Sequence, residues 1–365
     1  MNQEIKNKLS DLGIEFEENK SLANYTTWKI GGPAEILIEA NSKDQLIRTH
    51  EVCEAHGVSL TILGGGSDVL ISDSGIHGVV VINKAKDIEI LDAKTHDSLN
   101  TQEAQEYSMW RDAKVDHRHG EAGSDFYTFE DLDYNETGPT TLVRFDSGVV
   151  LSYAIAYTIK NGLTGLQWFA GIPGTMGGAL YNNVHGGTKH LSDNFVQSTI
   201  IDEQGIRQVG LDYFEFGYDQ SALRHKKGVI VLDVTMSLFN DSDVDKAKFV
   251  AREWARRKRI QPRVSAGCVF QNILPLDQLQ HNLPSPSVGY MVDKVFNWSG
   301  KREGGAMISD KHSAFIENID NATARDVLIL IKAIKSEARQ RFDINLIPEI
   351  NLLGFEESEI SDIID

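Results

Sequence analysis

Apolar positions in the N-terminal quarter of the chain change from helical to strand spacing. Ser42 and Gln45 form an S-x-x-Q capping box, which typically begins a helix. The helical face that follows it consists of Leu46, His50 and Cys53. Residues 58–62 alternate between apolar and polar side chains, and residues 79–82 are a β-branched run. The pattern predicts a helix followed by two strands, with a glycine-rich segment between the strands.

Periodic segments reappear further along the chain. Residues 149–161 have a helical pattern, and residues 229–234 are nearly continuously apolar, as in a buried strand. Residues 243–260 are expected to form a basic amphipathic helix. We expect Asn321 to cap the strongest helix of the chain. The apolar stripe of that helix consists of Val327, Leu330, Ile331, Ile334 and Ala338.

Residues 87–139 have a different character from the segments around them. They contain fourteen acids and four bases, and so carry ten of the chain's 17 net negative charges. They have few aliphatic side chains and no sustained period. We expect an acidic insertion or long loop outside the core, and prefer a solvated excursion to the alternative of a functional lid.

The composition is that of a globular protein, with 41% hydrophobic and 24% charged residues in 365. This length predicts two or three domains. A net charge of −17 argues against a general nucleic-acid binder, which needs a basic face. No apolar run approaches the roughly 18 residues of a membrane helix, and the N-terminus lacks the apolar core of a signal peptide. We therefore expect a cytoplasmic protein in which Cys53 and Cys268 are free thiols.

Two glycine-rich loops are candidates for a cofactor site. The first consists of Gly64, Gly65, Gly66, Ser67 and Asp68. Its glycines let main-chain N–H groups converge on an anion, although a tight turn explains them equally well. The second contains Gly171, Ile172, Pro173, Gly174, Gly177 and Gly178, and is followed by Asn182 and Asn183. Backbone so rich in glycine lies against a flat ligand or another backbone. We expect strands to flank both loops, and weigh a dinucleotide cofactor evenly against a structural role.

Two side chains in the C-terminal third are candidates for proton chemistry. Cys268 follows the basic run 256–259, whose positive charge would lower the pKa of the thiol. The alternative is a small buried apolar residue, which is the commoner role of a lone cysteine. Glu349 follows Pro348 within an apolar run. A carboxylate in such surroundings is either ion-paired or positioned for proton transfer.

Taken together, these motifs resemble the UDP-N-acetylenolpyruvoylglucosamine reductases (UDP-N-acetylmuramate dehydrogenases) of bacterial cell-wall synthesis. The pattern GIPGTxGG, combined with a C-terminal x-P-E, is the most specific part of the resemblance. Most of the chain runs in the order of the family. The matching segments are residues 24–34, 63–73, 162–193, 261–272, 289–293, 304–318 and 321–354.

The resemblance implies an α+β protein. It has the FAD-binding two-subdomain fold of the vanillyl-alcohol-oxidase-like class, plus a C-terminal α+β substrate domain. The first subdomain is expected at residues 1–84, with residues 343–356 returning to it. The second is expected at residues 85–238 and contains the insertion at about 87–139. The substrate domain is expected at residues 239–342.

The resemblance also implies two hydride transfers. NADPH would reduce a non-covalently bound FAD held by residues 64–68 and 171–183, and the flavin would then reduce the enolpyruvyl ether of UDP-N-acetylglucosamine enolpyruvate. Cys268 stands at the place of the family's proton-donating serine, and Glu349 would stabilise the intermediate. The residues expected to bind the substrate are Tyr218, Arg259 and Asn272. No metal is implied.

One position differs in charge from the family pattern. The family motif Y-R-x-S carries an arginine that stabilises the intermediate, whereas residues 218–221 read Y-D-Q-S. Asp219 therefore replaces that arginine, and a carboxylate beside Glu349 would repel developing negative charge. Arg224, a few residues further on, is a candidate replacement.

Three functions follow from these residues. The first is the family's FAD-dependent, NADPH-using reductase in peptidoglycan synthesis, with a nucleotide-sugar substrate and no nucleic-acid or membrane partner. The second is a flavoenzyme of the same fold with another substrate, which Asp219, Cys268 and the acidic segment favour. The third is a catalytically inactive flavin-binding or interaction protein. His185 and His190 are expected to be loop residues without a covalent bond to flavin. The sequence makes no prediction of the oligomeric state.

Overall fold

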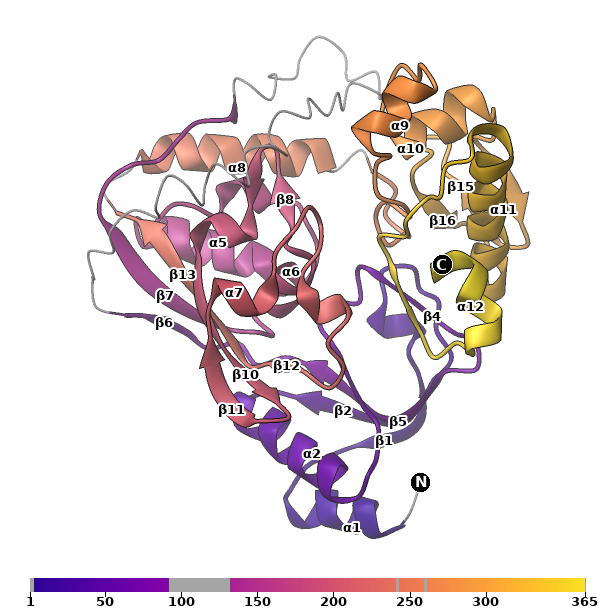
Figure 1. The fold of residues 1–365 in the computed structure, drawn as a ribbon. Helices are drawn as coiled ribbons and strands as arrows, with labels where there is room; N and C mark the ends of the chain where they lie inside the picture. The colour runs from indigo at the N-terminus through magenta and orange to yellow at the C-terminus, as the bar shows by residue number, and fades with distance from the viewer. Residues whose placement is uncertain (1–2, 92–131, 241–242, 259–260, 365) are drawn as a thin grey trace.

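The chain folds into three neighbouring regions, which Figure 1 shows in indigo to purple, in purple through magenta to salmon, and in orange to yellow. The computed structural model describes residues 3–91, 132–240, 243–258 and 261–364. No helix within these ranges is both long enough and apolar enough to span a membrane.

The N-terminal sheet has the strand order β1-β2-β5-β3. Strands β2, β5 and β3 are parallel, and β1 is antiparallel to β2. The bounds are β1 Glu17–Ser21, β2 Pro33–Ala40, β3 Leu60–Leu63 and β5 Ile76–Asn83. Helix α2 (Lys43–Ala55) connects β2 to β3, and α1 (Gln3–Asp11) packs against α2. The strands predicted near residues 58–62 and 79–82 are confirmed.

The predicted N-cap of α2, Ser42, is present, but the side chain of Gln45 accepts its hydrogen bond from a different residue than predicted. Ser42 Oγ accepts a hydrogen bond from the Gln45 N–H at 3.2 Å. The Gln45 Oε1 accepts from the N–H of Asn41 at 2.7 Å, and not from Ser42 as a capping box requires. Leu46 and Cys53 are buried, because this face of α2 packs on the apolar core of the sheet.

The larger sheet is antiparallel, with the order β11-β10-β13-β7-β6 and with β12 beside β10. The bounds are β6 Ile88–Ile90, β7 Thr140–Asp146, β10 Phe195–Asp202, β11 Gly205–Val209, β12 Ile230–Val231 and β13 Asp233–Phe239. The single strand predicted over 229–234 is wrong, because the pairing breaks at Leu232. Before this residue the chain pairs with Ile200 and Ile201, and after it β13 continues beside β7.

Three helices share the core of the larger sheet, as Figure 1 shows. They are α5 Leu151–Lys160, α6 Met176–Asn182 and α8 Val244–Lys258. Helix α5 confirms the helical pattern over 149–161, and α8 confirms the one over 243–260 as far as residue 258. Residues 259–260 lie outside the described residues. A short helix, α7 Leu211–Phe214, follows β11.

The acidic segment 87–139 begins and ends in ordered structure. Strand β6 pairs with β7, and Leu132 is fully buried in the core of the larger sheet. The Nε1–H of Trp168 donates a hydrogen bond to the Leu132 carbonyl at 3.4 Å. The expectation that the whole segment is a loop outside the core is therefore wrong at both ends. Residues 92–131 lie outside the described residues.

The C-terminal region combines a small antiparallel sheet, in the order β14-β15-β16, with four helices. The bounds are β14 Arg302–Glu303, β15 Ala306–Ile308, β16 Ile316–Asn318, α9 Pro275–Gln280, α10 Val288–Tyr290, α11 Ala324–Phe342 and α12 Glu357–Ile364. All five residues of the stripe predicted for the strongest helix are buried on α11. They form part of the core of this region.

The N-cap of α11 is Thr323, and the prediction of Asn321 is wrong. Thr323 Oγ1 accepts from the Asp326 N–H at 3.1 Å. The carboxylate of Asp73, from the N-terminal region, accepts from the N–H of Ala324 at 2.8 Å. These two acceptors satisfy donors that the first turn of a helix leaves free.

The chain returns to the N-terminal region near its end. Strand β17 (Asn351–Leu353) pairs in parallel with β4 (Val69–Ile71). Because β4 directly follows the first glycine-rich loop, this pairing puts the segment after Glu349 beside that loop.

Candidate active site

The two glycine-rich loops pack against each other backbone to backbone. A Cβ on Gly64 would lie 2.5 Å from Thr175 Oγ1, and one on Gly65 would lie 2.8 Å from Gly174 Cα. The hydroxyl of Ser67 donates to the Pro173 carbonyl at 3.1 Å. The first loop connects β3 to β4, as a loop between strands should. The second does not lie between strands, because it follows a short 3-10 helix and opens α6.

The first loop has the features of an anion site. Within the described part of the chain, the main-chain N–H groups of Gly65, Gly66, Ser67 and Asp68 have no hydrogen-bond acceptor. Several consecutive free N–H groups on one loop suit a phosphate or pyrophosphate. The residues therefore fit the pyrophosphate of a dinucleotide.

The glycines of the second loop serve two purposes. Gly171 has a φ of +86°, and a Cβ there would lie 2.9 Å from Lys258 Cβ on α8. A Cβ on Gly177 would lie 2.9 Å from the Cβ of Ser147. These two glycines allow close packing within the protein. Gly178 is exposed and has no atom nearer than 3.6 Å to its Cβ position, so it leaves space for a ligand.

Two amides at the end of α6 connect it to other parts of the site. The Asn182 Nδ2 donates to Asp68 Oδ2 in the first loop at 2.7 Å. Asn183 ends the helix in the left-handed conformation, and its Nδ2 donates to the Gly217 carbonyl at 2.9 Å. Asn183 therefore positions the turn that carries Tyr218.

Cys268 and Glu349 lie on neighbouring extended segments. The Glu349 N–H donates to the Val269 carbonyl at 2.9 Å, and the Gln271 N–H donates to the Ile347 carbonyl at 3.0 Å. This antiparallel pairing brings together two residues that are 81 positions apart in the sequence. Both are half-buried, and both cysteines of the chain are free thiols.

Comparison with known proteins assigns the chain to a family. A family model described as "UDP-N-acetylenolpyruvoylglucosamine reductase, C-terminal domain" matches residues 261–353, and one described as "FAD binding domain" matches residues 130–209. The UDP-N-acetylenolpyruvoylglucosamine reductase of Bacillus pumilus is 30% identical over 97% of this chain and 99% of its own length. The chain belongs to the UDP-N-acetylenolpyruvoylglucosamine reductase family. The reductase of Bacillus subtilis is also 30% identical, over 92% of this chain and 93% of its own length.

A crystal structure of a reductase of this family supports the same fold. The UDP-N-acetylenolpyruvylglucosamine reductase of Thermus caldophilus superposes with a TM-score of 0.64 at 24% identity, over 93% of this chain and 98% of its own. Together with the match to the FAD-binding domain, this similarity confirms the predicted α+β, FAD-binding fold class.

Burial raises the pKa values of the two candidate acids of this reductase-family site. It raises the pKa of Glu349 well above the ordinary value, and the negative charges of Asp219 and Asp68 add to this effect. Burial also raises the pKa of Cys268, with Glu349 as the next cause and Lys258 opposing it. The expectation that the basic run lowers the pKa of the thiol is therefore wrong, because the desolvation of a thiolate outweighs one nearby cation.

Tyr218 and Asp219 form the tip of a tight turn between Gly217 and Gln220. Burial and the charges of Asp219, Glu349 and Cys268 raise the pKa of Tyr218, while a hydrogen bond with Asn272 lowers it. The structure thus brings Tyr218 and Asn272 into contact, close to both candidate acids. Asp219 is buried, and its Oδ1 lies 2.6 Å from the Nδ1 of His185.

Arg224 is a cation that hydrogen bonds hold beside Glu349 and Asn182. Its Nη2 donates to Asn182 Oδ1 at 2.8 Å and to the main-chain carbonyl of Glu349 at 2.9 Å. It also lies 3.9 Å from Asp68 Oδ2. The Nε is buried and has no acceptor among the described residues. Burial raises the pKa of Asp68 to about 7, against the charge of Arg224.

Sequence reasoning missed part of this arrangement. In the sequence, Arg224 was a candidate only because it follows the Y-D-Q-S motif closely. Lys258 was not distinguished from the rest of the basic run 256–259. Asn351 was not singled out, although its Nδ2 donates to Asp68 Oδ2 at 3.0 Å. Arg259, predicted to bind the substrate, lies outside the described residues. Among the described residues, no three His, Cys, Asp or Glu side chains are grouped as metal ligands.

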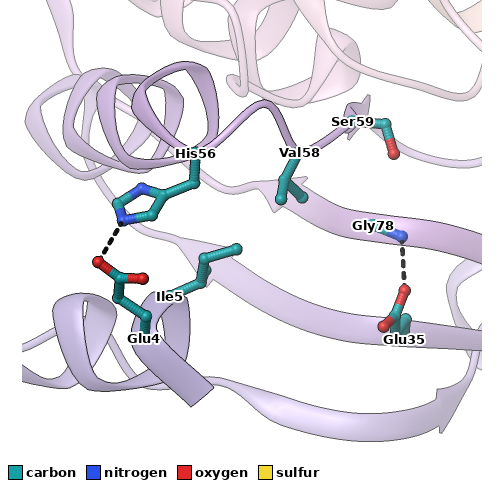
Figure 2. Close-up of a pocket in the computed structure, with 7 residues that line it drawn as sticks. All are labelled: Glu4, Ile5, Glu35, His56, Val58, Ser59 and Gly78. Carbon is teal, nitrogen blue, oxygen red and sulfur yellow. Dashed lines mark hydrogen bonds and ion pairs between the residues drawn. The ribbon is translucent and has the colours of Figure 1, made fainter. Parts of the chain in front are cut away.

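A separate hollow of about 420 Å³ lies between α1, α2 and β5, and Figure 2 shows the side chains around it. His56 Nε2 is 3.9 Å from Glu4 Oε1, and the Gly78 N–H donates to Glu35 Oε2 at 3.0 Å. None of the candidate site residues lines this hollow. Its polar groups are engaged with the protein, and it offers no arrangement for catalysis.

Proposed function

We propose that this chain is an FAD-dependent reductase that converts UDP-N-acetylglucosamine enolpyruvate to UDP-N-acetylmuramate with NADPH, in cytoplasmic peptidoglycan precursor synthesis. The observation that carries the proposal is that Cys268 and Glu349, two acids with raised pKa values, lie on paired segments near the glycine-rich loops of a chain with an FAD-binding domain. Relatives that are 30% identical over nearly the whole chain are named as reductases of this compound, which supports the substrate.

The main chain of residues 64–68 is proposed to hold the pyrophosphate of FAD, and Gly174, Gly178 and Asn182 to line the adjoining surface. When bound, FAD supplies the hydride transfer that protein side chains do not perform. The engagement of His185 Nδ1 with Asp219 supports a flavin held without a covalent bond. The pairing of β17 with β4 supports the assignment of residues 343–356 to the first subdomain.

Cys268 is proposed to donate the proton that completes the reduction. The reaction adds hydride to one carbon of the vinyl ether and a proton to the adjacent carbon. Because its pKa is raised, the thiol carries its proton at neutral pH and transfers it only to a strongly basic centre. An enolate-like carbon is such a centre, so Sγ–H suits this step in the place of the family's serine hydroxyl.

Glu349 is proposed to donate a hydrogen bond to the substrate carboxylate as negative charge develops on it. An ionised Glu349 would repel that charge, and burial raises the pKa of Glu349, which favours the protonated form that can donate. Arg224 and Lys258 add positive charge nearby, since both oppose the rise in the pKa of Glu349. Tyr218 and Asn272 are proposed to contact the substrate from the side of Cys268.

One observation favours a second candidate function, a flavoenzyme of this fold with a different substrate. Asp219 stands where the family motif has an arginine, so the charge near the substrate differs from that of the family. A substrate that carries less negative charge at this place would suit Asp219 better.

A single reoxidation experiment separates these functions. Purified yellow protein is reduced anaerobically with NADPH and then mixed with UDP-N-acetylglucosamine enolpyruvate, while the flavin absorbance is followed. Rapid reoxidation with formation of UDP-N-acetylmuramate is expected. Reduction by NADPH without reoxidation by this compound would point to another substrate, and bound FAD that NADPH does not reduce would point to an inactive protein.

A further inference from the structure

A histidine and an aspartate form a close pair at the edge of the candidate site. His185 Nδ1 lies 2.6 Å from Asp219 Oδ1, with 23% and 10% of the two side chains exposed. His185 belongs to the two-residue strand β8 (His185–Gly186), which pairs with β9 (Lys189–His190). Asp219 lies at the tip of the Gly217–Gln220 turn with a φ of +50°. Both residues are thus held by the backbone, and their contact connects two separate segments.

The same pair lies against the ring of Tyr218. The ring centroids of His185 and Tyr218 are 5.1 Å apart, with an angle of 33° between the planes. The His190 ring packs edge-on to Tyr218 at 6.1 Å. Tyr218 also hydrogen-bonds with Asn272 and lies near Cys268 and Glu349. Any movement of the His185–Asp219 pair would therefore move the phenol that faces the candidate acids.

The pair also affects the electrostatics of the site through the carboxylate of Asp219. Its carboxylate adds to the electrostatic cost of ionising Glu349 and Cys268, so a bare Asp219 would disfavour negative charge on a bound substrate. The His185 imidazole, whose Nδ1 lies within hydrogen-bond distance of Asp219 Oδ1 at 2.6 Å, offsets this charge at close range. The pair is thus compatible with an anionic intermediate, whereas an isolated aspartate is not.

We propose that His185 and Asp219 act as one positioning pair, in which the imidazole of His185 offsets the charge of Asp219 and the two together hold Tyr218 against the substrate. The pair thereby removes the repulsion that a lone Asp219 would add at the place where the family motif has an arginine. This inference rests on the proposed function. It assigns a role to His185 that the sequence did not reveal.

The test is a double-mutant cycle on the FAD-bound protein. The variants are His185→Ala, Asp219→Arg and His185→Ala/Asp219→Arg. Each single change breaks the contact between His185 and Asp219, so each should slow flavin reoxidation by the enolpyruvyl substrate by about tenfold or more. The double variant restores an arginine and removes the imidazole that would crowd and repel it. Its reoxidation rate should return to within a few-fold of wild type. Reduction of the flavin by NADPH is measured in parallel and should slow less than reoxidation does.

A second pair of variants covers a failure of Asp219→Arg to fold. Asp219→Asn keeps the shape of the side chain and should retain FAD, with slower reoxidation. Adding His185→Ala to Asp219→Asn should then change the rate little, because the pair is already broken. The inference is overturned if the two substitutions act independently in this cycle, or if a folded His185→Ala/Asp219→Arg is as slow as the product of the single effects. Wild-type protein that the substrate does not reoxidise would instead refute the proposed function.

Discussion

The two halves of the candidate site are built from different parts of the polypeptide. The paired glycine-rich loops are made from main chain, where Cβ atoms at Gly64 and Gly65 would collide with the opposite loop. The half around Cys268 and Glu349 is made from side chains whose pKa values depend on burial and on neighbouring charges. The first half therefore tolerates little change in shape. We expect the second to tolerate exchanges such as cysteine for serine, as long as the protonation states suit the proposed reaction.

The largest expected effect is on the main-chain half. Gly65→Val should abolish FAD binding, because its Cβ would lie 2.8 Å from Gly174 Cα and separate the two loops. The measurement is the flavin absorbance of the purified protein, together with its thermal unfolding. Gly210→Val is the matched control, since its nearest neighbour would be 3.9 Å away, and it should keep FAD. A yellow, stable Gly65→Val protein would contradict the close packing of the loops.

The next largest effect is expected from changing Cys268, in the side-chain half of the site, and it should fall on only one of the two half-reactions. Cys268→Ala should leave reduction of the flavin by NADPH nearly intact and slow reoxidation by the substrate by about 10²–10⁴-fold. Cys268→Ser should keep substantial activity, because its hydroxyl also carries a proton at neutral pH. Stopped-flow absorbance measures both half-reactions. Equal rates of reoxidation in wild type and Cys268→Ala would remove this thiol from the mechanism.

Thiol reactivity tests the direction of the pKa shifts without any substrate. Burial raises the pKa of Cys53 to about 11, and the pKa of Cys268 is raised as well. Because only the thiolate reacts, iodoacetamide at pH 8 should label both at least about 100-fold more slowly than an exposed thiol. Labelling should accelerate as the pH rises or the protein unfolds. Fast labelling of Cys268 near neutral pH, read by peptide mass spectrometry, would show that the nearby cations dominate after all.

A smaller effect distinguishes two adjacent glycines within α6. Gly177→Ala should destabilise the protein by about 1–3 kcal/mol, because its Cβ would lie 2.9 Å from Ser147 Cβ. Gly178→Ala, whose Cβ position is open, should be neutral or stabilising by up to about 1 kcal/mol through helix propensity. Denaturant unfolding of the two variants measures the difference. Equal destabilisation by both would mean that the packing against Ser147 is not the cause.

The smallest expected effect concerns the acidic segment. Replacing residues 92–131 by a short Gly/Ser linker should preserve FAD and the unfolding temperature. Replacing all of 87–139 should not, because it removes β6 and the buried Leu132. Comparing the flavin content and melting of the two deletions checks this difference. Insoluble protein from the shorter deletion would show that the interior of the segment is structural.

Secondary structure that follows from local pattern was predicted well. The stripe of α11 and the helical pattern of α5 depend on the spacing of apolar residues within one element, which a sequence displays directly. The start of α11 was predicted two residues too early, although its capping pair, Thr323 and Asp326, is local in the sequence. The break at Leu232 was also missed, since it depends on which residues of β10 lie opposite. Local spacing contains no information about partners distant in the chain.

By itself, the sequence determined the family resemblance, the two glycine-rich loops, and the chemical identity of Cys268 and Glu349. Only the tertiary structure decided that the loops pack on each other, that Arg224 contacts Glu349, and that His185 pairs with Asp219. It also reversed the expected direction of the Cys268 pKa shift. The physical reason is that desolvation and electrostatic interaction depend on distances through space, and burial at this site outweighs the charge of a basic run nearby in the sequence.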